Sequence, residues 1–258
     1  MRNASVEDIE VGFNYLLGKM TEAKPYNMKI KVYPTVDHLS DAINNQKVMG
    51  YFGPPLLFLQ NKDTFDTDYI FTPVLNDKVM QRYFLLVRKD NVIDKFEKLK
   101  NKSLSYCETD EVGIFYLNKL IKEKKLGQLD TFFSKMMVKK NPSLVISAVF
   151  FKETQASIVL ESDFMVATEL NPQLKTQLIA VEVSPEYITN MLAIHKNIEG
   201  PLTKSEYEAH VSSLGGAIKS KKMFQNYNYG SLKKIKLEDL NSVSDLINSL
   251  NDSKGLVK

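Results

Sequence analysis

Hydrophobic positions along the chain switch repeatedly between the spacing of helices and that of strands. Ser5 stands where a helix N-cap belongs, and apolar residues then share one helical face over residues 5–20. Residues 28–32 alternate apolar and lysine side chains, which predicts a half-buried strand. We further expect a short helix over 36–43, a strand over 48–52 and, after Gly53-Pro54-Pro55, a helix over 56–59. This alternation of helix and strand favours a parallel sheet.

A second alternating series begins at Tyr83. The spacing predicts strands over 83–87, 104–107, 136–138, 156–160 and 178–183, helices over 112–125 and 143–151, and a helical stretch over 203–250. No internal repeat or Gly/Ser linker interrupts the chain, so two lobes would be joined by strands. The prediction is an α/β protein whose first lobe takes residues 1–80 and 185–258 and whose second lobe takes 81–184.

Composition narrows the class of protein. The chain has 258 residues, of which 43% are hydrophobic, enough for a substantial core. Its 34 basic and 31 acidic residues are interspersed, whereas binding of nucleic acid needs a concentrated basic face. No apolar run approaches the roughly 18 residues of a membrane span. The start shows no signal-peptide pattern, so we expect a cytoplasmic chain or one that begins after a removed signal.

Residues suited to catalysis are scattered. His38, His195 and His210 form no pair with the spacing of metal ligands. Cys107 has no second cysteine for a disulfide, and a small buried apolar side chain is a better interpretation of it than a nucleophile. The sequence has no nucleophile elbow, phosphate loop or cofactor fingerprint. We therefore expect no enzyme activity, metal or cofactor, and an enzyme using Cys107 or a pair of acids is the least favoured alternative.

Three strand-to-helix junctions are candidate binding positions: residues 51–54, 107–113 and 161–163. Ligands of doubly wound sheets bind beyond the carboxyl ends of strands, where helix N-termini present free N–H groups and a positive dipole end. Several such junctions facing one cleft make a small-molecule site, commonly for an anion.

The third junction is acidic. The apolar strand 156–160 ends at Glu161, Ser162 and Asp163, and Glu108 and Asp110 stand at the neighbouring junction. We expect these groups to face a cleft opposite residues 51–54 and to attract amines or cations rather than anions. In the alternative, Asp163 only caps the following helix and Glu161 points to solvent.

Several stretches of the sequence together resemble one family. They are SVEDIEVGFNYLLGKM, LSDAINNQKVMGYFGPPLLFL, YFLLVRKDNVIDKFEKLKNKSLSYCE, AVFFKETQASIVLESDFMVATELNPQL with the following VEVSPEY, and MFQNY. Their order resembles the phosphate/phosphonate-type periplasmic substrate-binding proteins of ABC transporters. The resemblance implies a two-lobed Venus flytrap of the type II periplasmic-binding-protein fold, with mixed, mostly parallel sheets. The family's first strand should precede SVED, and from the short MRNA start we expect this strand, and one ligand loop with it, to be missing.

The resemblance also implies ligand positions, and this chain departs from them. The family's Ser-Thr-Ser-Gly turn, which donates to a phosphonate, falls on Asp110-Glu111-Val112-Gly113. A family tyrosine falls on Gln81, and carboxylates that meet an amine fall on Asp163 and Asn190. The candidate ligand-binding residues are Tyr51, Gly53, Gln81, Tyr83, Glu108, Thr109, Asp110, Glu161, Ser162, Asp163 and Asn190.

The leading hypothesis is an extracytoplasmic, periplasmic solute-binding protein without enzymatic activity. It would close two lobes on a small solute for an ABC transporter, hinging near residues 80–83 and 183–189. Its expected partners are a small-molecule ligand and a transporter permease, and the ligand is expected not to be a simple phosphonate. The alternative is a binding-fold domain repurposed as a sensor or partner-docking module with a degenerate cleft.

Overall fold

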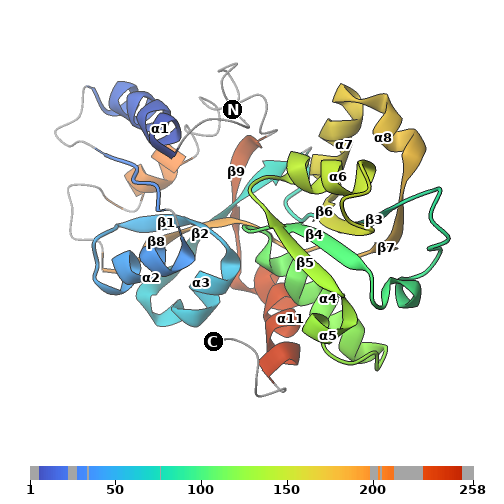
Figure 1. Ribbon diagram of the computed structural model, residues 1–258. Coiled ribbons are helices and arrows are strands. Elements are labelled where there is room, and N and C mark those ends of the chain that lie inside the picture. Colours follow the sequence, from blue (N-terminus) through green and yellow to red (C-terminus); the bar gives the residue numbers. More distant parts are fainter. Residues whose placement is uncertain are drawn as a thin grey trace. The chain divides into compact units, whose positions relative to one another are not determined.

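The computed structural model describes residues 6–22, 28–33, 35–75, 77–197, 203, 205–211 and 229–251. The chain divides into two compact units. The first unit comprises Met1–Val79 and Asn190–Asp239, and the second comprises Met80–Thr189 and Leu240–Lys258. Each unit is built on its own sheet (Figure 1).

The first unit has a four-stranded sheet in the order β1-β8-β2-β9, with every pairing antiparallel. Its strands are β1 (Gly50–Gly53), β2 (Phe65–Leu75), β8 (Met191–His195) and β9 (Tyr229–Ile235). Strands β1 and β8 approach so closely that a Cβ at Gly50 would lie 2.5 Å from the carbonyl oxygen of Ala193. Glycine is therefore required at Gly50 by the close approach of two backbones.

Helices and short helical turns cover both faces of this sheet. They are α1 (Val6–Thr21), α2 (Val36–Asn44), α3 (Pro55–Gln60), η1 (Lys62–Thr64), residues 205–211 and η3 (Leu237–Leu240), which ends at the boundary between the units. On one face Phe58 of α3 stacks on Phe65 at a centroid distance of 5.8 Å. On the other, Tyr207 and Val211 pack against Phe71 and Ile194.

The second unit has a five-stranded mixed sheet in the order β5-β4-β6-β3-β7. Strand β4 pairs in parallel with β5 and β6, whereas β3 pairs antiparallel with β6 and β7. The strands are β3 (Tyr83–Arg88), β4 (Ser103–Cys107), β5 (Lys135–Lys139), β6 (Ala156–Leu160) and β7 (Leu178–Val183). Every residue of β6 is buried, as expected for a strand covered on both faces.

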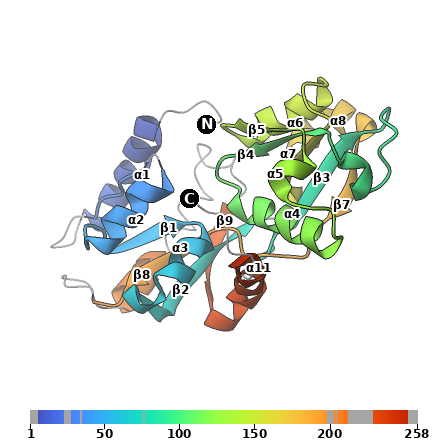
Figure 2. The ribbon, with the colours of Figure 1, turned by 60° about the horizontal axis from the view of Figure 1, so that its bottom comes forward.

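Two groups of helices sandwich this sheet (Figure 1). One group is α6 (Pro142–Phe150), α7 (Glu161–Leu170) and α8 (Pro172–Gln177); the other is α4 (Glu111–Glu123), α5 (Leu129–Phe132) and α11 (Asn241–Asn251), and η2 (Phe96–Leu99) precedes β4. Val149 and Phe164 of the first group pack on Leu86 and Val159 of the sheet. Helix α11 lies beside α4 (Figures 1 and 2).

The structure confirms the α/β class and corrects several predicted elements. Residues 28–33 form no strand, because side chains of α1 take their hydrogen bonds: the Ile30 N–H donates to Asn14 Oδ1 at 2.7 Å and the Val32 N–H to Glu10 Oε2 at 2.9 Å. The stretch 203–250 is not wholly helical, since it contains β9. Strands β2 and β8 were not predicted. Among the strands that the structure describes, parallel pairing is limited to β4 and its two neighbours.

Some sequence features lie outside the described residues, and the structure therefore leaves them as predictions. They are the Ser5 cap, the Gly215-Gly216 pair and the MFQNY stretch. Within the described part of the chain, no helix has both the length and the apolar character needed to cross a membrane.

Candidate functional site

The candidate site lies where β4 and β6 end in the second unit. Because these strands are parallel neighbours, their carboxyl ends meet at one edge of the sheet. Strand β6 leads directly into α7, and β4 reaches α4 through residues 108–110. Strand β3 begins at the same edge, where Tyr83 pairs with Leu160. Two helix N-termini and the start of β3 thus meet there.

Asp110 is the most unusual group of this edge. It is the N-cap residue of α4, but its side chain makes no capping hydrogen bond. Its Oδ2 atom is buried and has no hydrogen-bond partner. Burial, and then the charge of Asp163, raises the pKa of Asp110 to about 8. At neutral pH Asp110 therefore exists mainly as the uncharged carboxylic acid.

Tyr83 is the buried aromatic residue at the same edge as Asp110. Its ring is almost fully buried against the first turn of α4, where a Cβ at Gly113 would lie 2.8 Å from its Cε1 atom. Burial, followed by the charges of Asp110 and Asp163, raises the pKa of Tyr83 well above its usual value, although a backbone hydrogen bond at Gly113 lowers it. The ring can occupy this place only because residue 113 has no side chain.

Cys107 lies at the end of β4 and is buried. Its Sγ atom lies 3.3 Å from Thr109 Oγ1 in a hydrogen bond. Burial, and then the charge of Asp110, raises the pKa of the Cys107 thiol. Since the thiolate is the nucleophilic form, this environment suppresses the reactivity of Cys107.

Glu161 forms an ion pair within the second unit. Arg82 Nε donates to Glu161 Oε2 at 3.1 Å and Arg82 Nη2 donates to Glu161 Oε1 at 3.2 Å, a two-point contact. The Glu161 N–H also donates to the Arg82 carbonyl at 2.8 Å. The charge of Glu161 is thereby offset, and the alternative in which it simply points to solvent is wrong.

The capping alternative for Asp163 is also wrong. Helix α7 begins at Glu161, and Leu160 is its N-cap residue. Asp163 is therefore the third residue of the helix, where its charge still interacts favourably with the helix dipole. The error arose because the helix starts directly from the buried strand, without a polar turn.

The remaining candidates of the second unit differ in exposure. Gln81 and Ser162 are buried, and Glu108 and Thr109 are exposed. The backbone of Gln81 exchanges two hydrogen bonds with Tyr187, both 2.8 Å long. This pairing joins the two segments at which the chain enters and leaves the second unit.

Three candidates belong to the first unit. Tyr51 is buried, its hydroxyl donates to the Pro54 carbonyl at 3.1 Å, and burial raises its pKa. Gly53 is buried as well, and the Asn190 carbonyl accepts a hydrogen bond from Thr72 Oγ1 at 2.9 Å. Tyr51 thus contributes to the core of its unit, and the expected facing of residues 51–54 and 161–163 stays a prediction.

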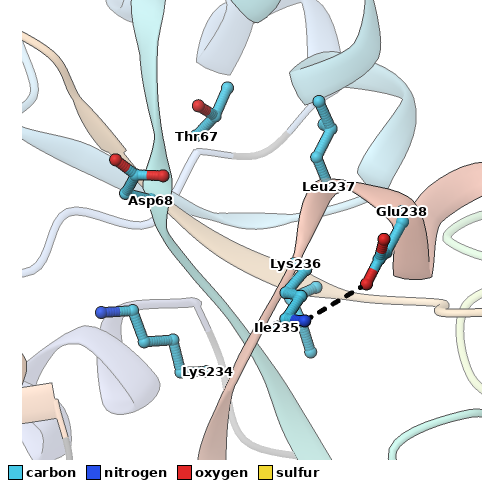
Figure 3. Close-up of a pocket in the computed structure, with 7 residues that line it drawn as sticks. All are labelled: Thr67, Asp68, Lys234, Ile235, Lys236, Leu237 and Glu238. Carbon is cyan, nitrogen blue, oxygen red and sulfur yellow. Dashed lines mark ion pairs between the residues drawn. The ribbon is translucent and has the colours of Figure 1, made fainter.

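A separate open pocket of about 730 Å³ lies in the first unit beside β2 and β9 (Figure 3). Its lining residues are Thr67, Asp68, Lys234, Ile235, Lys236, Leu237 and Glu238. Lys236 pairs with Glu238 at 3.4 Å (Figure 3), and Lys234 pairs with Glu208 at 3.1 Å. Because both lysines already contact an acid, this pocket is a weaker candidate for binding a charged solute than the edge at Asp110. The described residues include no group of three metal-ligating side chains placed to hold a metal ion.

Comparison with known proteins points to one family. A family model described as "ABC transporter, phosphonate, periplasmic substrate-binding protein" matches residues 3–240. No curated protein sequence matches the chain.

Solved structures of the same fold are distant in sequence. A binding protein component of an ABC phosphonate transporter from Pseudomonas aeruginosa has 13% identity and a TM-score of 0.71, over 98% of this chain and 87% of that one. PhnD1 from Prochlorococcus marinus in complex with methylphosphonate has 15% identity and a TM-score of 0.71, over 96% and 94%. The periplasmic aliphatic sulphonate binding protein of Escherichia coli has 10% identity and a TM-score of 0.61, over 96% and 83%. At these identities, the similarity shows the fold.

Proposed function

The chain belongs to the family of periplasmic substrate-binding proteins of phosphonate ABC transporters, and on that premise we propose that it binds a small solute other than a simple phosphonate. Members of this family are the substrate-binding components of transporters, not enzymes. The proposed binding position is the edge of the second unit where α4 and α7 begin. A transporter permease is the proposed partner, and closing of two lobes around the solute stays a prediction from the sequence.

The carboxyl of Asp110 is the observation that supports this choice of ligand. It stands at the start of α4, where the family resemblance expects hydroxyl groups that donate to a phosphonate. Because Asp110 is mainly uncharged at neutral pH, the repulsion of a phosphonate would come from the charge of Asp163, which acts at this edge. An anion about 4 Å from that charge would be repelled by roughly 4 kcal/mol near a protein surface, so we expect the site to disfavour anions.

Isothermal titration calorimetry tests the exclusion of phosphonates. We expect inorganic phosphate and methylphosphonate to bind far more weakly than micromolar at neutral pH. The triple variant Asp110→Ser, Glu111→Thr, Val112→Ser introduces the family's donor turn and is expected to strengthen methylphosphonate binding. A matched control, Asp94→Asn with Glu153→Gln, removes two acids that contact lysines elsewhere in the second unit and is expected to leave binding unchanged. Micromolar affinity of the wild-type protein for methylphosphonate would refute the proposal.

The sensor or docking alternative has some support of its own. Tyr51 and Glu161 are engaged in contacts inside their own units, as expected if they no longer serve a ligand. A thermal-shift screen over phosphonates, sulfonates, amines and amino acids separates the two functions. A solute that raises the melting temperature supports solute binding, whereas no response to any class supports the docking module.

A further inference from the structure

The end of the second unit opposite the candidate site brings several segments together. The carboxyl end of β3 meets the starts of β6 and β7 there. Arg88, the last residue of β3, donates from Nη1 to the Phe150 carbonyl and to Gln177 Oε1. Asp90 pairs with Lys152 at 3.0 Å. These contacts join the loop after β3 to the end of α6 and the end of α8.

Three large apolar side chains are exposed to solvent at this end. Val92 lies in the loop after β3, Phe151 at the end of α6 and Leu170 at the end of α7, and they are 85%, 75% and 76% exposed. No other large apolar side chain in the described ranges is as exposed as these. Single exposed apolar residues are ordinary, but the three most exposed ones at a single end of one sheet indicate a contact surface.

The same end is positively charged. We call it the basic end and define it by the four segments that lie there, which are residues 88–102, 122–135, 150–155 and 169–178. Together they contain twelve basic and seven acidic residues, a formal charge of +5, whereas the whole chain has +3. The segments at the candidate site contain three basic and seven acidic residues; they are 81–83, 107–113, 139–144, 160–164 and 182–187. The second unit is therefore basic at one end of its sheet and acidic at the other.

Several lysines of the basic end are free to contact a partner. Lys89, Lys100 and Lys102 are exposed, and among the described residues their ammonium groups form no ion pair. An open hollow of about 470 Å³ is lined by Val92, Lys98, Lys100 and Lys102, among other residues. Cationic and apolar side chains thus lie on one surface.

We propose that the basic end docks on a membrane surface that contains anionic lipids. Val92, Phe151 and Leu170 insert among the lipid headgroups, and the free lysines contact lipid phosphates. A bilayer accepts separate protruding apolar side chains, whereas a folded protein partner needs a surface of complementary shape. The acidic candidate site lies at the other end of the sheet and stays away from the lipid charge. The proposal does not depend on the solute.

Flotation of the full chain with lipid vesicles tests this docking. One set of vesicles is phosphatidylcholine alone, and the other contains about one-third phosphatidylglycerol. We expect binding to the anionic vesicles to be at least about ten-fold tighter at low salt, and to weaken steeply toward about 0.5 M NaCl. Absence of binding to the anionic vesicles, or equal binding to both sets, overturns the proposal.

Substitutions test whether the basic end makes the contact. Each lysine near an anionic bilayer strengthens binding about five-fold, so Lys100→Gln with Lys102→Gln should weaken it at least about ten-fold. Val92→Ser with Phe151→Ser should weaken it at least about five-fold through lost apolar insertion. All four side chains are exposed, so the variants should keep the stability of the wild type in urea unfolding.

Matched controls remove the same groups elsewhere. Lys47→Gln with Lys140→Gln removes two exposed positive charges outside the basic end. Val138→Ser with Leu144→Ser removes two exposed apolar side chains near the candidate site. We expect each control to change vesicle binding by less than about two-fold. Equal losses in the controls and in the variants of the basic end overturn the proposal.

A fluorescent label separates a bilayer from other anionic partners. The only cysteine, Cys107, is buried, so a polarity-sensitive dye attaches selectively to Val92→Cys or to the control Leu144→Cys. We expect anionic vesicles to shift the emission to the blue for the Val92→Cys protein alone. Binding to polyglutamate or duplex DNA as tight as to the vesicles, without a blue shift, indicates a general polyanion surface and overturns the proposal. Calorimetry with methylphosphonate tests the proposed function separately.

Discussion

Replacing Asp110 by asparagine should remove a pH-dependent penalty on folding. An acid whose pKa is raised in the folded state stabilises that state fully below its unfolded pKa, and the contribution is lost as pH rises toward the folded pKa. With values of 3.8 unfolded and about 8 folded, ionisation of Asp110 costs about 4 kcal/mol more at pH 9 than at pH 5. Relaxation around the ionised group reduces the cost, so we expect a measured difference of about 2–4 kcal/mol.

Urea unfolding of the wild type and of Asp110→Asn at pH 5, 7 and 9 measures this difference. The free energy of unfolding of the wild type should fall between pH 5 and pH 9 relative to that of the variant, so the variant gains relative stability as pH rises. Asp94→Asn is a suitable control, because Lys98 lowers the pKa of this exposed acid and its contribution lies at low pH. Parallel curves for the wild type and Asp110→Asn would refute the assignment of a raised pKa to Asp110.

Two further experiments test the packing and charge of the same edge. Gly113→Ala should lower the free energy of unfolding by about 1–3 kcal/mol, because the new Cβ would overlap the buried ring of Tyr83. The control Gly18→Ala, which has open space around it, should raise the free energy of unfolding by about 0.5–1 kcal/mol. Equal effects of the two variants in urea unfolding would show that the ring does not constrain residue 113. A double-mutant cycle with Arg82→Met and Glu161→Gln should give a coupling free energy of about 0.5–1 kcal/mol, since the ion pair is partly exposed. A coupling of zero would show that this contact contributes nothing to stability.

Local pattern was enough to predict most elements of the second unit. Its strands are short apolar runs with clear flanking turns, and β3, β4 and β6 begin or end within a residue or two of the predicted bounds. The first unit was harder to predict, since β2 contains the polar residues Asp66, Thr67, Asp68 and Thr72 and pairs with strands far along the chain. Its antiparallel pairing comes from those distant contacts, which no local spacing contains.

The local pattern also indicated where the candidate residues lie relative to the strands, but it did not indicate which contacts their side chains make. The sequence placed Asp110 and Asp163 at strand ends, and the structure puts both at helix starts on one sheet edge. It could not show that Arg82 engages Glu161, because 79 residues separate them. Nor could it show that Tyr83 fills the space left by Gly113, because that contact depends on how α4 packs over β3.

The position of β8 between β1 and β2 has a consequence for synthesis of the protein. In the sheet, β8 lies between β1 and β2 and pairs with both, so these two strands are not hydrogen-bonded neighbours of each other. In the chain, β8 comes after the whole 80–189 segment. The ribosome therefore synthesises all five strands of the second sheet, the last of which ends at Val183, before it synthesises β8. At about 5–20 residues per second, synthesis of the segment between β2 and β8 takes about 6–23 s, and β1 and β2 wait that long for their partner. During that interval both strands expose open edges, the surfaces that recruit chaperones or pair with other nascent chains.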